Sequence, residues 1–243
     1  MVRLPIPPER IAADLWLSPA ERHYLCDVLR LEGGATVEVF DGLGGRFSAR
    51  LDAARTHLSL GERLPDLDDG GGGPVALAPA LIKNDRLDWA IEKATELGAA
   101  RIEPWSAANC VVRLDARRSV ERQARWQKVA AAAARQCGRA AIPEVAAPRA
   151  LEALLQDATR RGELAVVLFE RELDCRFSEL VRALDPAQPL LIVSGPEGGF
   201  REEEIALARA LGARTASLGR RILRAETAPI AALAAVRALH GEL

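Results

Sequence analysis

The sequence predicts an α/β protein of two domains, a small β-rich domain followed by a larger domain with a parallel sheet. Three observations lead to this prediction. Two short segments of alternating polarity near the start flank a glycine turn, four consecutive glycines at Gly70–Gly73 then interrupt the chain, and apolar runs of strand length alternate with helical patterns beyond them. With 243 residues, 49% hydrophobic and 28% charged, the chain is long enough to bury a sizeable core.

The first domain, residues 1–70, is expected to be a small β-barrel. Thr36–Phe40 and Arg46–Leu51 alternate in polarity, and Asp41–Gly45 between them supplies turn residues, so these segments predict a β-hairpin. The segment Asp66–Pro74 combines acidic residues with glycines, which offer no side chains to a core. We place the domain boundary there.

The second domain, residues 74–243, alternates between strands and helices as an α/β domain does. Its first strand is predicted at Val75–Ile82, and the apolar residues that follow recur at helical spacing until Gly98, which ends the helix. The other predicted elements are a short strand, a helix rich in alanine and arginine, two continuous apolar strands and a final helix: Arg101–Trp105, Val120–Gly138, Leu164–Phe169, Pro189–Val193 and Ala228–Leu239. Thr227 is expected to cap the final helix.

Composition restricts the class of protein. The four cysteines form no CxxC pair and have no histidines at zinc-ligand spacing, so we expect reduced thiols, no metal site and a cytoplasmic protein. No apolar run approaches the roughly 20 residues that span a bilayer, so we expect no membrane association. The net charge of −1 leaves nucleic acid open as a partner, because a local basic surface can bind phosphates.

A basic stretch runs from Arg113 to Arg139 and contains only Asp115 and Glu121 as acidic residues. It is a candidate surface for a polyanion. The alternative is a solvated helix that happens to be rich in arginine.

The segment Ile192–Phe200 ends a buried strand with three glycines and then leads into a helix. Open α/β sheets bind ligands at the carboxyl ends of their strands, where glycine permits close approach and a positive φ, and we expect this of Gly198. The loop is neither a P-loop nor GxGxxG, and Glu197 with Glu202–Glu204 disfavours a phosphate ligand. The alternative is an ordinary strand-to-helix turn.

A second loop, Ser217–Ala228, contains a glycine, three arginines and one glutamate before the last helix. A tight loop here would bury Ile222 and Leu223 and direct Arg224 and Glu226 toward a common edge. There the two charged residues either pair with each other or face a ligand. By contrast, Lys93 and Glu96 lie on the polar face of the amphipathic helix at Lys83–Gly98, where a solvated surface is expected.

Together these segments resemble the ribosomal RNA small subunit methyltransferase E family of the SPOUT class. The matching stretches are, in chain order, His23–Arg30, Glu92–Gly98, Arg135–Arg139 with Ile142–Pro143, Gly195–Phe200 and Leu218–Ala228. The resemblance spans nearly the whole chain. The chain departs from the family pattern at Arg135, where glutamate is common, and at Arg201, Arg220 and Ala225.

The resemblance implies a PUA-like RNA-binding β-barrel domain (1–70), a SPOUT methyltransferase domain with a trefoil-knotted parallel sheet (74–243), and a homodimer. The apolar helix segment Ile230–Leu239 is a candidate pairing surface. The implied activity is methylation of uridine N3 in 16S ribosomal RNA, either naked or within the small ribosomal subunit, with S-adenosyl-L-methionine as cofactor. The alternatives are another SPOUT enzyme, acting on transfer RNA or on a ribose 2′-hydroxyl, and a non-catalytic RNA-binding protein of ribosome assembly.

The resemblance also implies site residues. The cofactor is expected to be bound, mainly through backbone groups, by Leu168, Phe169, Glu170, Ser194, Gly195, Glu197, Gly198, Gly199, Leu218, Gly219, Ile222, Leu223 and Thr227. Arg224 and Glu226 are the catalytic candidates, Arg224 to stabilise charge on a uracil carbonyl or hold a phosphate, and Glu226, like Glu197, as an available carboxylate base. The RNA contacts are expected at Arg22, His23, Tyr24, Arg30, Arg135 and Arg139.

Overall fold

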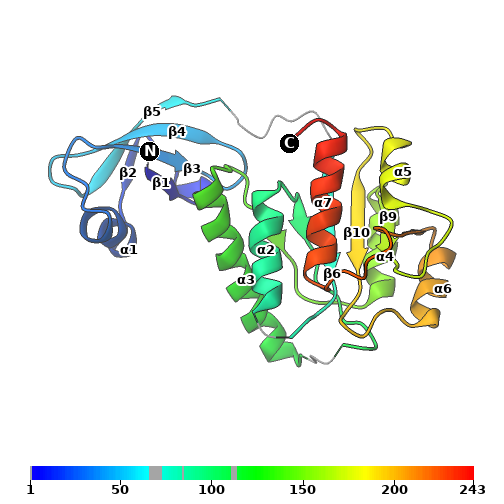
Figure 1. Cartoon of the computed structure of the whole chain (residues 1–243). Coiled ribbons are helices and arrows are strands. Elements are labelled where there is room, and N and C mark those ends of the chain that lie inside the picture. Colours follow the sequence, from blue (N-terminus) through cyan, green and yellow to red (C-terminus); the bar gives the residue numbers. More distant parts are fainter. Residues whose placement is uncertain (1, 66–72, 84, 111–113) are drawn as a thin grey trace. The chain divides into compact units, whose positions relative to one another are not determined.

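A computed structural model of the chain describes residues 2–65, 73–83, 85–110 and 114–243. The chain forms two compact units, one of residues 1–69 with 134–142 and one of residues 70–133 with 143–243 (Figure 1). Most of the predicted boundary at Asp66–Pro74 lies outside the described residues. The sequence does not predict that Ala134–Ile142 groups with the first unit.

The first unit contains a five-stranded sheet in the order β1–β3–β4–β5–β2. The strands are β1 (Val2–Pro5), β2 (Asp14–Trp16), β3 (Thr36–Phe40), β4 (Arg46–Leu51) and β5 (His57–Arg63). Strands β3 and β4 pair antiparallel from Thr36 opposite Arg50 to Phe40 opposite Arg46, which confirms the predicted hairpin. Strands β1 and β2 stand at the two ends of this order, so the pairing of the described residues gives an open sheet instead of the closed barrel that the sequence predicts.

The first unit also contains short helical segments: η1 (Pro8–Arg10), α1 (Pro19–Arg22) and the π-helix η2 (His23–Val28). Helix α1 begins at a capping box, in which the Glu21 amide donates to Ser18 Oγ and the Ser18 amide donates to the Glu21 carboxylate. The wider turns of η2 bring the Leu29 amide to the Tyr24 carbonyl at 3.0 Å. This geometry directs Leu25 and Cys26 into the core and leaves the predicted RNA-contact segment at the surface.

A buried ion cluster explains why Ala134–Ile142 belongs to the first unit. Glu38, only 5% exposed, accepts hydrogen bonds from Arg3 Nε at 2.8 Å and from Arg46 Nε at 2.9 Å. Arg3 Nη1 donates to the carbonyl oxygens of Ala134 and Arg139, both at 3.1 Å. A buried carboxylate needs such partners, and the cluster therefore joins segments far apart in the sequence.

The second unit contains a six-stranded parallel sheet in the order β11–β9–β10–β6–β7–β8. The strands are β6 (Val75–Pro79), β7 (Arg101–Ile102), β8 (Glu144–Val145), β9 (Leu164–Leu168), β10 (Leu190–Ser194) and β11 (Arg214–Ala216). All residues of the central strands β6 and β10 are buried. The continuous apolar runs in the sequence are thus confirmed as strands covered on both faces.

The helices of the second unit surround this sheet. They are α2 (Arg86–Glu96), α3 (Ala116–Cys137), α4 (Leu151–Arg160), α5 (Phe177–Arg182), α6 (Glu202–Ala210) and α7 (Thr227–Leu239). Helix α7 packs on α2 and α5, as Figure 1 shows for α2, while α4 packs on α6. As predicted, Gly98 and Gly138 follow the ends of α2 and α3, with φ angles of +80° and +95° that favour glycine.

The start and the apolar face of α7 differ from the predictions. The helix begins at Thr227 with Glu226 at the N-cap position, so the prediction of Thr227 as N-cap is wrong by one residue. Ala232, Leu233 and Val236 are fully buried within the unit because α7 packs on β6 and β10. The apolar face that the sequence offers for subunit pairing is therefore already covered.

No helix in the described part of the chain is long and apolar enough to cross a membrane. The described residues also contain no group of three or more His, Cys, Asp or Glu side chains that could hold a metal ion.

Candidate active site

A cavity of about 590 Å³ lies at the carboxyl ends of the parallel strands of the second unit. Its wall consists of the segments that follow β9, β10 and β11, together with the starts of α2 and α7. Ligand sites in proteins occupy about 300–1,000 Å³, and open α/β sheets place their ligands at this edge. The cavity therefore has the size and position of a small-molecule site.

The cavity gathers nearly all residues that the sequence analysis assigns to the cofactor. Its lining includes Leu168, Phe169, Glu170, Ser194, Gly195, Glu197, Gly198, Gly199, Leu218, Gly219, Ile222 and Leu223. Both catalytic candidates, Arg224 and Glu226, line it as well. Thr227 is outside the lining, and its amide donates to the Arg224 carbonyl at 2.9 Å in the first turn of α7.

The three glycines of the loop after β10 occupy different structural settings. Gly199 has a φ of +71°, whereas Gly198 does not have a positive φ, so that part of the prediction is wrong. A Cβ atom on Gly195 would lie 2.8 Å from the Phe200 ring, which stacks on Trp105 with 5.6 Å between ring centroids. Gly195 thus lets the loop close over a buried aromatic pair.

Gly198 provides room for Asn109, a residue that the sequence analysis did not single out. The Asn109 side-chain amide donates to the Gly198 carbonyl at 3.4 Å and to the Gly199 carbonyl at 3.3 Å. Asn109 Oδ1 in turn accepts from Arg201 Nε at 3.0 Å. The segment around Asn109 therefore braces the glycine loop from outside the cavity, and no local sequence pattern signals this contact.

The loop after β11 is exposed where the sequence predicts burial. Ile222 is 84% exposed and Leu223 is half-buried. The loop wraps the cavity and does not pack on the sheet, so Ile222 lies at the cavity rim. The prediction that Ile222 is buried is therefore wrong.

Three charged side chains meet on one wall of the cavity. Glu226 is only 9% exposed, and its Oε1 lies 3.8 Å from Arg86 Nε and 4.0 Å from Arg224 Nη1. Its Oε2 is buried without a hydrogen-bond partner among the described residues. Arg86 begins α2 just after strand β6, and the sequence analysis missed it; its position near the carboxyl end of a parallel strand was the available signal.

Glu197 and Lys93 have simpler surroundings. The Glu197 carboxylate accepts the backbone amide of Lys83 at 3.2 Å and is exposed to solvent. Lys93 donates to Glu92 and Glu96, both at 2.7 Å, and these hydrogen bonds raise the pKa of Lys93. Lys93 and Glu96 are not part of the cavity lining, in agreement with the expected polar helix face.

The residues predicted to contact RNA lie together in the first unit. Arg22 and His23 are exposed, with Arg22 Nε bonded to the Arg55 carbonyl at 3.2 Å and His23 Nδ1 2.8 Å from Asp27. Arg135 stacks over the Tyr24 ring at 5.2 Å. Arg30 is exposed with a φ of +54°, and the carbonyl of Arg139 accepts from Arg3.

Part of the basic stretch on α3 is paired with acidic residues. Arg117 bonds Glu121 at 2.8 Å, and Arg125 bonds Asp88 at 2.5 Å and Asp85 at 2.8 Å. Arg113 lies outside the described residues. These pairs reduce the positive charge that the stretch offers to a polyanion.

Comparisons with known proteins agree with this fold and site. Residues 72–237 match the family model of an RNA methyltransferase domain, and residues 17–60 match that of an RNA methyltransferase PUA domain. The fold and the site are thus those of an RNA methyltransferase with a PUA-like domain. The chain belongs to the ribosomal RNA small subunit methyltransferase E family: it is 35% identical to the protein of that name from Synechocystis sp. over 98% of this chain and 77% of that one.

Two solved structures are similar over nearly the full length. The ribosomal RNA small subunit methyltransferase E from Neisseria gonorrhoeae, bound to S-adenosyl methionine, has a TM-score of 0.84 at 29% identity, covering 98% of each chain. A methyltransferase from Legionella pneumophila in complex with the cofactor SAM has the same TM-score and identity, covering 98% of this chain and 97% of that one.

Proposed function

We propose that this protein transfers a methyl group from S-adenosyl-L-methionine to N3 of a uridine in 16S ribosomal RNA. The observation that supports this most directly is the cavity at the carboxyl ends of β9, β10 and β11, which joins a glycine-lined pocket to a cluster of one carboxylate and two guanidinium groups. Relatives named ribosomal RNA small subunit methyltransferase E match the chain over most of its length.

The cavity residues fit this cofactor. Ser194 Oγ and Glu226 Oε2 are buried and have no hydrogen-bond partner in the described part of the chain. Because buried polar atoms are normally hydrogen-bonded, a ligand in the cavity could supply both missing hydrogen bonds. Gly199 and Gly219 line the cavity with φ angles of +71° and +126°, which favour glycine. Because glycine has no side chain, the backbone groups of both residues can approach a ligand closely. Leu168, Leu218 and Leu223 supply apolar surface for an adenine ring.

Bound S-adenosyl-L-methionine supplies a methyl group activated by its positive sulfur. The protein must place the uridine N3 in line with that methyl group, and such positioning provides much of the rate. In our proposal the N3–H bond breaks and its proton passes to the Glu226 carboxylate. The N3 electron pair forms the new bond to the methyl carbon as the bond from that carbon to sulfur breaks.

Arg224 is proposed to stabilise the negative charge that develops on a uracil carbonyl. Its side chain is 77% exposed and lies 4.0 Å from Glu226, the outer limit of an ion pair. A pair that is so exposed and so long contributes little stability. Arg224 therefore remains available to the substrate, which favours a role toward RNA over a purely bracing role.

We further propose that the chain threads into a trefoil knot and acts as a homodimer. The support for the knot is the path of the chain after β11, which is an edge strand of the sheet. From there the chain forms the loop that lines the cavity and continues into α7, which packs on the central strands β6 and β10. The support for the dimer is the family resemblance, since a SPOUT site is typically completed at the subunit interface.

We propose that residues 1–70 form an RNA-binding domain and residues 74–243 a methyltransferase domain, whose segment 134–142 groups with the first unit and adds to its RNA surface. The proposed RNA contacts are Arg22, His23, Tyr24, Arg30, Arg135 and Arg139. The match to an RNA methyltransferase PUA domain and the exposure of Arg22, His23 and Arg30 support this division. RNA affinity should then fall steeply with salt, because phosphate contacts release counterions. A protein that modifies ribosomal RNA, free or within the small ribosomal subunit, is expected in the cytoplasm.

The test is a methylation assay with radiolabelled S-adenosyl-L-methionine and two substrates, deproteinised 16S ribosomal RNA and small ribosomal subunits, both from cells that lack the modification. Nucleoside analysis should give 3-methyluridine, and primer extension should stop at one uridine. A 2′-O-methylated product or a transfer RNA product would assign the protein to another SPOUT activity. Absence of cofactor binding by calorimetry would identify a non-catalytic RNA-binding protein.

A further inference from the structure

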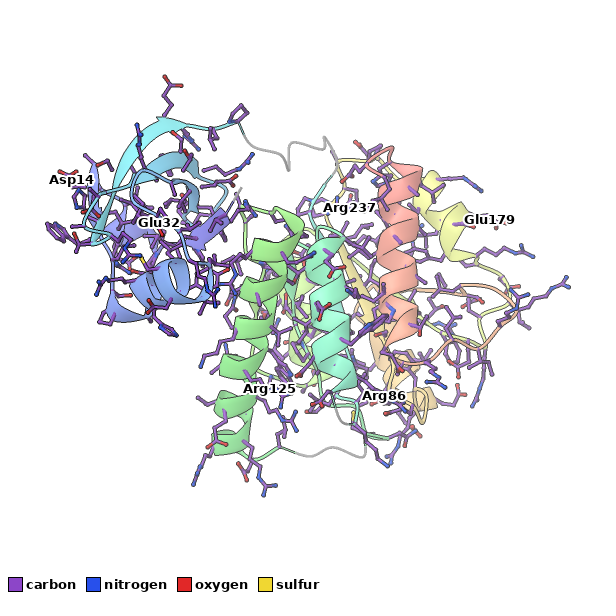
Figure 2. All side chains as sticks on the ribbon, turned by 60° about the vertical axis from the view of Figure 1, so that its left-hand side comes forward. Asp14, Glu32, Arg86, Arg125, Glu179 and Arg237 are labelled. Carbon is purple, nitrogen blue, oxygen red and sulfur yellow. The ribbon has the colours of Figure 1, made fainter. Side chains whose placement is uncertain are left out.

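Arg86, which was not among the predicted site residues, contributes to the same cavity wall as Arg224 and Glu226. It comes from the first turn of α2, whereas Arg224 and Glu226 come from the loop that precedes α7. Figure 2 shows Arg86 at the lower end of α2, beside the lower end of α7. The parallel packing of α2 and α7 on the sheet therefore brings together two guanidinium groups and one carboxylate.

The geometry of this cluster is that of a site left open for a ligand. Both guanidinium groups approach the same carboxylate oxygen, Glu226 Oε1, at 3.8 Å and 4.0 Å, distances beyond a direct hydrogen bond. The second oxygen, Oε2, has no hydrogen-bond partner among the described residues, although Glu226 is only 9% exposed. A buried carboxylate that is only loosely paired is costly unless a ligand completes its hydrogen bonds.

The cluster combines two hydrogen-bond donor groups with one acceptor group, and both donor groups lie near the same oxygen of the acceptor. A guanidinium group only donates and an ionised carboxylate only accepts. Uracil presents the complementary set of groups along its Watson–Crick edge, with two acceptors, O2 and O4, and one donor, N3–H. Proteins that bind unpaired RNA bases read this edge by hydrogen bonds.

We propose that Arg86, Glu226 and Arg224 together read the Watson–Crick edge of the target uracil, with Arg86 and Arg224 on its two carbonyl oxygens and Glu226 on N3–H. This rests on the proposed function and identifies the residues that select the base. Cytosine is rejected because its N3 lone pair would face the carboxylate and its amino group would face a guanidinium group. Glu226 takes the N3 proton and must then leave the line of attack, while the two arginine contacts to the carbonyl oxygens hold the ring for methyl transfer. Arg86 thus acts as a substrate-positioning residue.

A competing structural role for Arg86 is to brace the start of α7 through Glu226. The two roles differ in what they predict. A brace affects thermal stability and cofactor affinity and is indifferent to the atoms of the base. A base contact affects RNA kinetics and depends on one particular carbonyl oxygen.

The experiment combines protein variants with single-atom changes in the RNA. Arg86→Ala, Arg86→Lys and the wild type are compared on RNA with uridine, 2-thiouridine, 4-thiouridine or cytidine at the methylated position, because sulfur is a weaker acceptor than oxygen. Arg220→Ala is the control, because Arg220 is an exposed arginine of the loop that carries Arg224 and does not line the cavity. Cofactor affinity is measured by calorimetry and stability by thermal denaturation.

The wild type and Arg220→Ala should methylate the uridine substrate, lose activity with each thio substitution, and leave cytidine unmodified. Arg86→Ala should lose about 10- to 100-fold in kcat/KM for RNA with cofactor affinity nearly unchanged, as expected for one base-reading arginine. One of the two thio substitutions should cost Arg86→Ala nothing further, because its partner is already gone. Arg86→Lys should recover only part of the loss.

Equal sensitivity of Arg86→Ala and the wild type to both thio substitutions would overturn the proposal, as would a variant with unchanged kcat/KM. A drop in melting temperature and cofactor affinity without a change in base selectivity would assign Arg86 to the bracing role. Failure of the wild type to methylate any uridine would instead refute the proposed function itself.

Discussion

Asn109 packs so closely on Gly198 that a Cβ atom added to the glycine would lie 3.2 Å from the Asn109 Cβ and 3.4 Å from the Asn109 carbonyl oxygen. The contact joins two segments that are 89 residues apart and fixes the outer side of the cavity loop. A side chain at position 198 would therefore crowd a neighbouring chain segment, which would have to move by a few tenths of an ångström.

This contact predicts a suppressor. Gly198→Ala should weaken cofactor binding, since crowding a packed contact typically costs about 1–3 kcal/mol. Asn109→Gly in the same chain should restore part of the affinity by removing the crowding Cβ. Calorimetric titration with S-adenosyl-L-methionine measures both effects. If the double variant binds no better than Gly198→Ala, the contact does not explain the glycine.

Arg224 should act on RNA and not on the cofactor. Arg224→Ala should reduce single-turnover methylation on the order of 10² to 10³, the usual loss when one charge-stabilising donor is removed, and Arg224→Lys should not restore the rate fully. Cofactor affinity should remain nearly intact, because the Arg224 side chain is exposed and lies 4.0 Å from Glu226, so it contributes little to holding the loop. Parallel losses of cofactor affinity and thermal stability in Arg224→Ala and Glu226→Ala would show instead that the pair holds the loop.

Gly195 should be sensitive to even one added methyl group. A Cβ atom there would lie 2.8 Å and 2.9 Å from two atoms of the Phe200 ring, and the fully buried Trp105 behind the ring prevents it from moving away. Gly195→Ala should lower the free energy of unfolding by about 1–3 kcal/mol and weaken cofactor binding. Adding Phe200→Leu should relieve the clash in thermal denaturation. A wild-type melting temperature for Gly195→Ala would contradict this packing argument.

Asp52 should make the first unit sensitive to acid. Backbone amides of His57 and Thr56, with smaller contributions from the Thr56 hydroxyl and the Ala54 amide, lower the pKa of Asp52 to about 2 against the opposing effect of burial. The pKa of an aspartate in the unfolded chain is about 3.9. The lower pKa of Asp52 in the folded state therefore stabilises the fold fully above pH 3.9, and this stabilisation is lost as the pH falls toward 2. Hydrogen exchange at the amides of Ala54, Thr56 and His57 should accelerate over that interval. Asp52→Asn should already exchange faster at neutral pH, and an unchanged pH profile in this variant would argue against the assignment.

The proposed homodimer should give a light-scattering mass about twice the 26.2 kDa of one chain. Its interface must use surfaces other than the buried face of α7, because Ala232, Leu233 and Val236 are fully buried within one subunit. A monomer that retains full activity at micromolar concentration would exclude the dimer as a requirement for function.

Local sequence patterns were enough to predict most helices and strands of the second unit. Apolar runs predicted β6, β9 and β10, the period of Leu87–Leu97 predicted α2, and Gly98 and Gly138 marked the ends of α2 and α3. The glycine and arginine loops were predicted to face a ligand, and both line the cavity. Such loops can be picked out because side-chain chemistry and turn preference are properties of short stretches of chain.

Which distant residues share the cavity depends on how the strands and helices are arranged in space. Arg86 reaches Glu226, and Asn109 braces Gly198, through the order of the parallel strands, and neither pairing leaves a trace in local periodicity. The burial of Ile222 was predicted wrongly for the same reason: whether a loop residue is covered depends on what packs against it. Local sequence fixes backbone preference within a few residues, whereas burial and contact depend on the arrangement of elements across the whole sheet.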